Sequence, residues 1–248
     1  MRSCIEILKK IVIGLGENNN VEKAVNKFNS EYNVNINIVN DSDSLVKSIS
    51  DKNIDAVVRG SLPASNIINS LKNQYPQYHI NRATFIENDN YKLLIAPVGI
   101  DEGKTINERL ILTEQCVEFF KKLNIEPKIA ILAKGRSDDY NRTESIDESL
   151  KNSEILTTEL KKKYPEYQVK NYYILFEKAL NDKFNIILAP DGVIGNILFR
   201  SLVLVNKWPS MGAISLGIPN IYIDTSRDQS IEGYYRSLKL AYYLCKNK

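Results

Sequence analysis

The sequence predicts an α/β protein: a three-layer α/β/α arrangement around a mixed, mostly parallel sheet. First, short β-rich runs alternate with amphipathic helical segments along the 248 residues. Second, the early strands are nearly continuous apolar runs, which is typical of parallel strands covered on both faces. Third, two apolar runs in the middle are separated only by Asn88, Asp89 and Asn90, which indicates an antiparallel hairpin.

The first third of the chain contains three strand–helix pairs. The first helix has an apolar face of Val21, Ala24, Val25 and Phe28, and the second is capped between Asp41 and Ser44, with Leu45, Val46 and Ile49 facing inward. The third helix opens on Pro63. The predicted strands are 11–16, 35–39 and 55–60, and the predicted helices are 20–32, 44–53 and 63–76.

The rest of the chain begins with the hairpin and returns to alternating strands and helices. Its apolar and polar segments have the lengths expected for these elements. The predicted strands are 83–88, 91–99, 128–133, 167–176, 184–189, 212–217 and 220–225. The predicted helices are 105–124, 146–163, 193–206 and 231–245.

Composition excludes several classes of protein. The 33 Lys and Arg residues nearly balance the 30 Asp and Glu residues, giving a net charge of +3 without a basic stripe, so nucleic-acid binding is not expected. No uncharged apolar run approaches the roughly 18 residues that a membrane span needs. The first residues do not have the pattern of a secretory signal. We therefore expect a soluble cytoplasmic protein.

The chain has one histidine, His79, and three cysteines. One histidine cannot form a two-His metal centre, and no CxxC motif is present, so we expect no metal site. Cys4, Cys116 and Cys245 are far apart in sequence, which predicts free cysteines that serve as small buried apolar residues.

Candidate ligand-binding residues follow the predicted strands, because ligands of open α/β sheets collect at the carboxyl ends of strands. Gly14 and Gly16 lie at the end of the first predicted strand. They indicate either a tight turn or a close approach of the backbone to a ligand, although the GxGxxG motif is absent. Arg59 lies at the end of the third predicted strand, and Ser61 directly follows that strand. They suit an oxyanion, unless Arg59 pairs with an acidic neighbour instead.

Two later junctions are also candidates. Gly135 lies in the polar segment 134–145, which is either a binding loop or a solvated surface loop. Asp191 precedes a helix whose first turn contains Gly195 and Asn196. Glycines on both sides of a helix start allow the backbone to approach another group closely, and we expect a ligand there.

The last junction places Ser226 and Arg227 between a strand and the final helix. A hydroxyl beside a guanidinium near a helix start suits an oxyanion, while helix capping is the alternative role for the serines here. The standard templates GxxxxGK[ST], HExxH and GxSxG are absent.

The order P-D-G, G-N-I, A-I-S-L-G-I and D-T-S-R in residues 187–233 carries a family resemblance. It resembles the phosphate acetyl/butyryltransferases, which share the isocitrate/isopropylmalate dehydrogenase fold. More narrowly, the chain is similar to the Mtx subunit X group of methanogenic archaea, a methyltransferase-related group. The segments 129–137 and 55–61 fall where that family has strand-plus-glycine loops.

The resemblance implies roles for individual residues. Ser226 would assist the reaction and Arg227 would bind the acyl or phosphate group, whereas Gly233 occupies the position of the family's catalytic Asp. Leu204 and Asn69 stand where the family has arginines. The expected ligand is phosphate or coenzyme A, and the remaining ligand-binding residues are Arg59, Ser61, Gly135, Asp191, Gly195 and Asn196.

The resemblance also implies two interleaved subdomains, 1–80 with 214–248 and 81–213, with a cleft between them, in a homodimer. Two functions follow. The first is a transferase with a phosphate acyltransferase-like cleft for a small anionic ligand. The second is a non-catalytic partner or regulatory subunit of a corrinoid methyltransferase system in methanogenesis.

Overall fold

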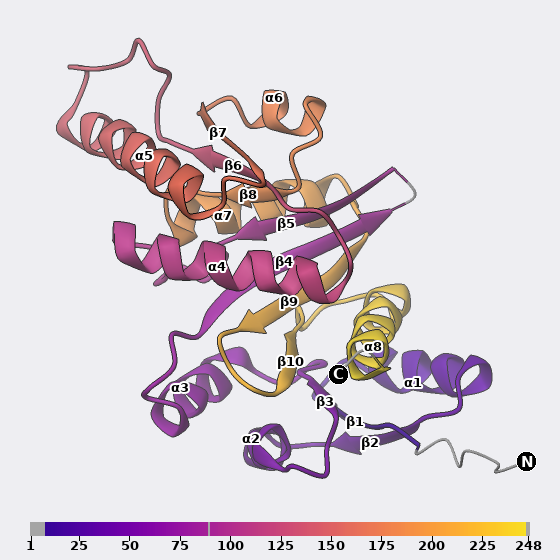
Figure 1. Cartoon of the computed structure of the whole chain (residues 1–248). Helices are drawn as coiled ribbons and strands as arrows, with labels where there is room; N and C mark the ends of the chain where they lie inside the picture. The colour runs from indigo at the N-terminus through magenta and orange to yellow at the C-terminus, as the bar shows by residue number, and fades with distance from the viewer. Residues whose placement is uncertain (1–7, 89, 247–248) are drawn as a thin grey trace, which may run out of the picture. The chain divides into compact units, whose positions relative to one another are not determined.

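The computed structural model describes residues 8–88 and 90–246. They form two compact units, one from the chain up to Tyr78 together with the segment from Ile218, the other from His79 to Gly217 (Figure 1). Both units are built on β-strands covered by helices, and the strands are mostly parallel. The predicted α/β class with a mixed, mostly parallel sheet is confirmed.

The first unit has four parallel strands in the order β2-β1-β3-β10. Because connections between parallel strands are right-handed, the change of direction at β1 places α1 and α2 on opposite faces. There α1 packs against α8, and α2 packs against α3. The elements are β1 (Lys10–Gly14), α1 (Asn20–Glu31), β2 (Asn35–Val39), α2 (Ser42–Ser50), β3 (Ala56–Val58), α3 (Ala64–Gln74), β10 (Ile221–Asp224) and α8 (Ile231–Lys246).

The apolar face predicted for the first helix is the buried face of α1. Phe28 is fully buried, stacks on Tyr32 at 4.4 Å and meets Tyr235 and Tyr242 of α8 edge-on. These tyrosines therefore join α1 to α8 within one chain. Asp41 caps α2 as predicted, by accepting a hydrogen bond from the Ser44 N–H.

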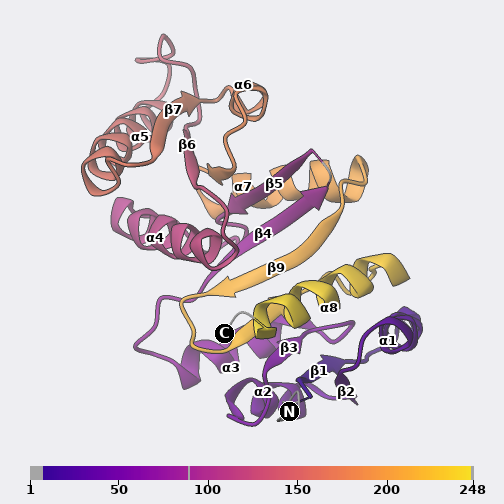
Figure 2. The same cartoon turned by 45° about the vertical axis from the view of Figure 1, so that its right-hand side comes forward.

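The second unit has six strands in the order β9-β4-β5-β8-β6-β7. The predicted hairpin is present: β4 lies antiparallel between β5 and β9 (Figure 2), whereas β5, β8, β6 and β7 are parallel. The strands are β4 (Asn81–Asn88), β5 (Tyr91–Ala96), β6 (Lys128–Leu132), β7 (Gln168–Tyr173), β8 (Ile186–Leu188) and β9 (Ser210–Leu216).

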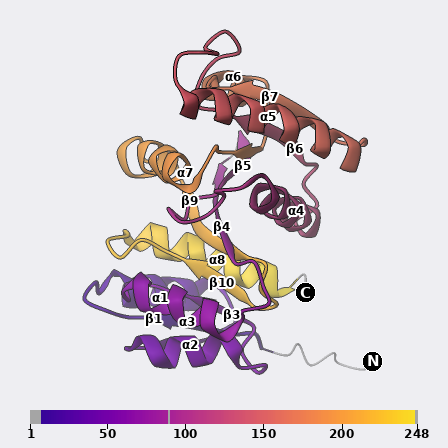
Figure 3. The same cartoon turned by 90° about the vertical axis from the view of Figure 1, so that its left-hand side faces the viewer.

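Helices cover both faces of this second sheet. Figures 1 and 3 show α4 on one face and α7 on the other, with α5 beside the β6–β7 edge. Thr105 begins α4 with a reciprocal capping box to Glu108. The helices are α4 (Ile106–Lys122), α5 (Glu144–Lys163), α6 (Phe176–Asn181) and α7 (Gly192–Phe199), and α7 continues as a π-helix, Arg200–Val205.

Two predicted elements differ from the structure. The predicted strand 167–176 ends at Tyr173, whose φ of 57° breaks the extended backbone, and the unpredicted helix α6 follows. The predicted helix 193–206 starts at Gly192 and changes to π-helical hydrogen bonding at Arg200. Propensity alone does not distinguish these two helix types.

Cys116 is a free, buried cysteine, as predicted, and burial raises the pKa of its thiol. Cys245 is also buried, as predicted. Cys4 lies outside the described residues. Within the described ranges, no helix is long and apolar enough to cross a membrane.

Substituting Phe28→Ala tests the joint between α1 and α8. We expect it to lower the free energy of unfolding by about 3–5 kcal/mol, because a fully buried aromatic ring leaves a cavity. Urea denaturation of the full chain measures this. The control, Asn26→Ala, lies on the exposed side of the same helix and is expected to change stability by less than about 0.5 kcal/mol. Equal effects of the two substitutions would contradict this packing.

Candidate functional site

In the first unit, the carboxyl ends of β1, β3 and β10 are tied together by short hydrogen bonds. The Arg59 N–H donates to the Ile223 carbonyl at 2.9 Å, and the Ser61 N–H donates to the Gly14 carbonyl at 3.1 Å. The Thr225 hydroxyl donates to the Gly60 carbonyl at 2.7 Å. Since these strands are parallel, the loops that follow them lie at one edge of the sheet.

Gly60 makes this close approach sterically feasible. Its φ is +64°, and a Cβ there would overlap the Gly14 carbonyl oxygen. Only glycine adopts this backbone conformation readily and also leaves that space empty. Gly14 at the end of the first strand and Gly60 after the third strand therefore bring two strand ends together.

Arg59 is buried, with 6% of its surface exposed. Its Nε pairs with the Asp224 carboxylate at the end of β10, and its Nη1 donates to the Leu62 carbonyl. The alternative role expected for Arg59 from the sequence is pairing with an acidic neighbour within the protein, and Asp224 is such a partner. Its role as a ligand-binding residue stays a prediction.

Ser61 is 1% exposed and holds the loop after β1. Its Oγ accepts a hydrogen bond from the Gly16 N–H at 2.8 Å and donates to the Asn18 carbonyl at 3.5 Å. The Ser61 hydroxyl therefore positions the loop that leads into α1. A contact between this hydroxyl and a ligand stays a prediction.

Ser226 and Arg227 differ from the other candidates because their backbones are held while their side chains have no partner among the described residues. The Tyr234 hydroxyl of α8 contacts the Ser226 carbonyl at 3.2 Å and donates to the Arg227 carbonyl at 2.6 Å. Asn18 also donates to the Arg227 carbonyl. A fixed backbone that presents an uncommitted hydroxyl and guanidinium is suited to oxyanion binding.

In the second unit, Asp191 joins two elements. Its Oδ1 caps α7 by accepting from the Ile194 N–H at 2.9 Å, and its Oδ2 pairs with Lys134 at 3.1 Å. Burial raises the pKa of Asp191, but the Ile194 hydrogen bond and the Lys134 ammonium outweigh it, so this pKa lies below its usual value. Asp191 is therefore an ionised carboxylate that fixes Lys134 at the end of β6.

The other predicted residues of this unit contact the chain itself. A Cβ at Gly195 would overlap the Pro97 carbonyl oxygen, and the Asn196 amide donates to the Val98 carbonyl at 2.9 Å. A Cβ at Gly135 would lie 2.9 Å from the Ile146 side chain. The close approach expected at Gly195 is therefore present, and the group approached is the polypeptide. Their ligand-binding roles stay predictions.

The sequence interpretation missed Arg109, in the first turns of α4. It is 2% exposed, and its Nε has no hydrogen-bond partner among the described residues. Burial lowers the pKa of Arg109, and the charges of Asp191 and Glu148 act against that shift. A sequence signal was present: Arg109 shares the helical stripe of the buried residues Leu112, Thr113, Cys116 and Phe120.

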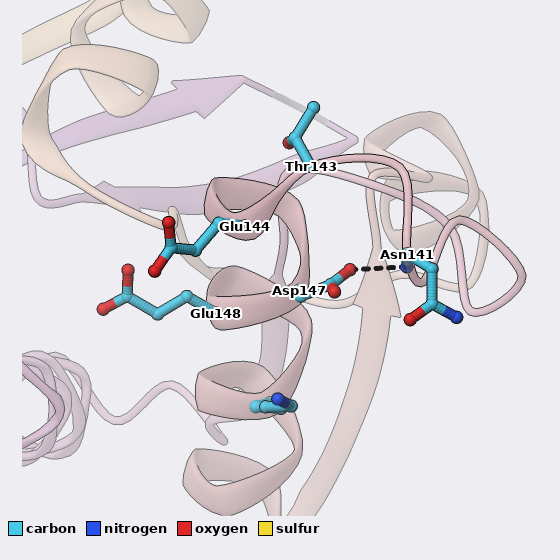
Figure 4. A pocket seen from close by; sticks show the side chains of 6 residues that line it. Asn141, Thr143, Glu144, Asp147 and Glu148 are labelled. Atoms are coloured by element: carbon cyan, nitrogen blue, oxygen red, sulfur yellow. Dashed lines mark hydrogen bonds between the residues drawn. The ribbon is translucent and has the colours of Figure 1, made fainter.

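A cavity of about 560 Å³ lies beside the start of α5, at the end of the polar segment 134–145 (Figure 4). Glu144 and Glu148 point to one side of the helix, whereas the Asp147 carboxylate accepts from the Asn141 N–H at 2.8 Å. Thr143 and Lys151 complete the lining. No group of three or more His, Cys, Asp or Glu residues suited to a metal occurs among the residues that the structure describes.

Known proteins resemble this chain in sequence, although no family profile matches it. An uncharacterized methyltransferase of Methanocaldococcus jannaschii is 34% identical over 236 residues, covering 92% of this chain and 94% of that protein. A Methanosarcina barkeri protein that carries the name methyltransferase mtx subunit X is 31% identical over 210 residues, covering 84% of this chain and 75% of that protein. This chain belongs to the mtx subunit X family.

Solved structures show the fold of this mtx subunit X family member. A branched-chain phosphotransacylase from Enterococcus faecalis superposes with a TM-score of 0.70 at 16% identity, covering 96% of this chain and 99% of that one. The EutD phosphotransacetylase from Staphylococcus aureus gives 0.65 at 14% identity, covering 97% and 94%. The predicted phosphotransacetylase-like fold is confirmed.

Three positions singled out by the resemblance provide no charged group in this chain. Gly233 is buried at the start of α8, where a Cβ would overlap the Gln229 side chain. Its neighbour Glu232 is ion-paired with Lys27 of α1 at 2.7 Å. Leu204 packs against the apolar core of the second unit, and Asn69 is exposed on α3.

Substituting Arg59→Met tests the network at the strand ends. We expect a loss of about 3–5 kcal/mol in the free energy of unfolding, because the Asp224 carboxylate stays buried without its cation. Denaturant titration measures it, with Arg136→Met, an exposed arginine, as the control. A loss below about 1 kcal/mol would show that the pair does not stabilise the strand ends.

Asp191 makes stability depend on pH. Asp191→Asn retains an N-cap oxygen and removes the charge, whereas Asp191→Ala also removes the cap, at a further cost of about 0.5–2 kcal/mol. The pKa of Asp191 in the folded protein lies below its unfolded value of 3.8. The carboxylate charge therefore contributes its full stabilisation of the folded state at pH values above 3.8. The difference between wild type and Asp191→Asn should shrink as the pH falls through the folded pKa. Thermal unfolding at several pH values measures it, and a difference that grows on acidification contradicts this account.

Proposed function

We propose that this chain is a transferase in which Ser226 and Arg227 bind a phosphate-bearing or acyl ligand such as coenzyme A or an acyl phosphate. The observation that carries the proposal is the contrast at the end of β10: the two carbonyls are held by Tyr234, while the hydroxyl and the guanidinium remain uncommitted. Family membership supports the transferase class, because the relatives carry methyltransferase names. The phosphotransacylase fold supports the ligand class.

In acyl transfer of this kind, the sulfur of coenzyme A attacks the carbonyl carbon of an acyl phosphate. A carbon–sulfur bond forms, the carbon–oxygen bond to phosphate breaks, and the thiol proton leaves to a base. Arg227 would hold the phosphate oxygens in a two-pronged contact. The Ser226 hydroxyl would donate to the oxygen on which negative charge develops. Neither role needs a metal ion.

Two of the other predicted residues, Arg59 and Ser61, act through Ser226 and Arg227. Arg59 ties β3 to β10, and Ser61 fixes the loop whose Asn18 holds the Arg227 carbonyl. We therefore place Arg59 and Ser61 as positioning residues. In the second unit, Asp191 would in the same way be a positioning residue, because it pairs with Lys134. A homodimer and a cleft between the subdomains stay predictions.

One observation favours a second function, a non-catalytic or regulatory subunit of a corrinoid methyltransferase system. The thiol proton needs an acceptor, yet Gly233 provides no side chain and Glu232 is engaged with Lys27. The name of the Methanosarcina barkeri relative, a subunit, is consistent with a partner. In that case the ligand site at Ser226 and Arg227 would serve for sensing rather than turnover.

A binding and activity series tests the proposal. We expect coenzyme A or acetyl phosphate to raise the melting temperature of the wild type, because a ligand that binds only the folded state stabilises it. Arg227→Met should weaken binding about tenfold to a hundredfold, since a hydrogen bond to a charged group is lost. Ser226→Ala should reduce the transfer rate more than the affinity. The control is Arg136→Met, which removes an exposed arginine elsewhere.

The outcomes separate the two functions. Acyl transfer between phosphate and coenzyme A that depends on Ser226 supports the transferase. Binding without turnover, with or without added methyltransferase proteins, supports the regulatory subunit. If the Arg227→Met variant bound coenzyme A and acetyl phosphate as tightly as the wild type does, neither the transferase nor the regulatory function would be supported.

A further inference from the structure

Arg109 is a buried cation for which the described protein supplies no hydrogen-bond acceptor. Its Nε is enclosed and unpartnered, and no hydrogen bond or ion pair links its guanidinium to another described residue. Burying an unsatisfied charged donor costs free energy. A hydrophobic residue at this position of the α4 stripe would be more stable, which points to a function for the charge.

The surroundings of Arg109 are those of a binding site. The loop from β5 into α4 covers its side chain at Gly103, where a Cβ would lie 3.5 Å from the Arg109 Cγ. The charge of Asp191 reaches Arg109, and Asp191 is paired with Lys134. These residues follow three neighbouring parallel strands, β5, β8 and β6, so they gather at the carboxyl edge of the sheet.

The nearby carboxylates leave the Arg109 Nε without a hydrogen-bond partner among the described residues. Asp191 and Glu148 are the carboxylates whose charges act on Arg109, and Glu148 is exposed and lines the neighbouring cavity. Both oxygens of Asp191 are already used, one by Ile194 and one by Lys134. Asp191 therefore has no free oxygen in the structure with which to accept a hydrogen bond from Arg109.

We propose that Arg109 and Lys134 form an oxyanion-binding site in the second unit that takes the phosphate or carboxylate group of a small ligand. Arg109 supplies the planar two-pronged donor, and Lys134, oriented by Asp191, supplies the second charge. The site does not involve Ser226 or Arg227, so it stands or falls independently of the proposed function.

Titration calorimetry in an Arg227→Met background tests the site without any contribution from the first unit. Inorganic phosphate and acetate are titrated separately, so the two arms distinguish a phosphate group from a carboxylate. We expect at least one of them to bind, and a further Arg109→Met substitution to weaken that binding about tenfold to a hundredfold. Lys134→Met should weaken it less, because Arg109 retains its two-pronged contact.

Stability separates a ligand role from a structural one. Without ligand, Arg109→Met should melt at the same or a higher temperature, since a buried unpaired charge is replaced by a side chain of similar size. Arg109→Lys keeps the charge but loses the fork, and should lose most of the binding. Arg136→Met, in the loop that contains Lys134, is the charge control and should bind normally.

Two results would overturn the proposal. One is that neither phosphate nor acetate binds to the Arg227→Met protein. The other is that Arg109→Met, or Arg109→Lys where the methionine variant does not fold, binds as the parent protein does. A lower melting temperature combined with unchanged binding would make Arg109 a structural residue.

Discussion

The buried ion pair between Arg59 and Asp224 is the interaction on which the proposed site depends. It joins the ends of β3 and β10, strands that are 165 residues apart in sequence, and it stands beside the Gly60 turn that brings β3 against β1. Removing either charge would leave the other buried and without this ion pair, which is costly in free energy. With three strand ends fixed, Tyr234 and Asn18 can hold the carbonyls of Ser226 and Arg227 in place. The ion pair thus acts on the proposed site through the backbone, and in that proposal Ser226 and Arg227 contact the ligand.

In the second unit, glycines and a helix cap hold the segments at the strand ends in place. Gly192 and Gly195 let α7 approach the carbonyls of the loop after β5, and Asp191 caps the helix while it holds Lys134. Burying α7 against backbone in this way uses positions where any side chain would collide. Near this arrangement, the Arg109 Nε has no hydrogen-bond partner among the described residues. Both units therefore combine a hydrogen-bonded framework at the strand ends with a cationic side chain that lacks a hydrogen-bond partner among the described residues, Arg227 in the first unit and Arg109 in the second.

Much of this fold could be predicted from local sequence patterns. The face of α1, the Asp41 cap and the 81–96 hairpin each follow from residues close together in the chain. The helix α6 and the π-helical turn after Phe199 were missed because a left-handed Tyr173 and a shift in hydrogen bonding have no composition signal. The candidate site was harder to predict. Glycine patterns marked close approaches correctly, but not whether the neighbour is a ligand or a carbonyl, and Arg109 was overlooked because a charge in an apolar stripe was not considered.

Arg59 forms an ion pair with Asp224, and we propose that Ser226 and Arg227 contact the ligand. A crystal structure of the protein soaked with coenzyme A and phosphate tests it most directly. The account predicts an oxyanion within hydrogen-bond distance of the Ser226 hydroxyl and the Arg227 guanidinium, with the Arg59–Asp224 pair intact. An oxyanion bound to Arg59, with Asp224 displaced and Arg227 directed into solvent, would contradict it.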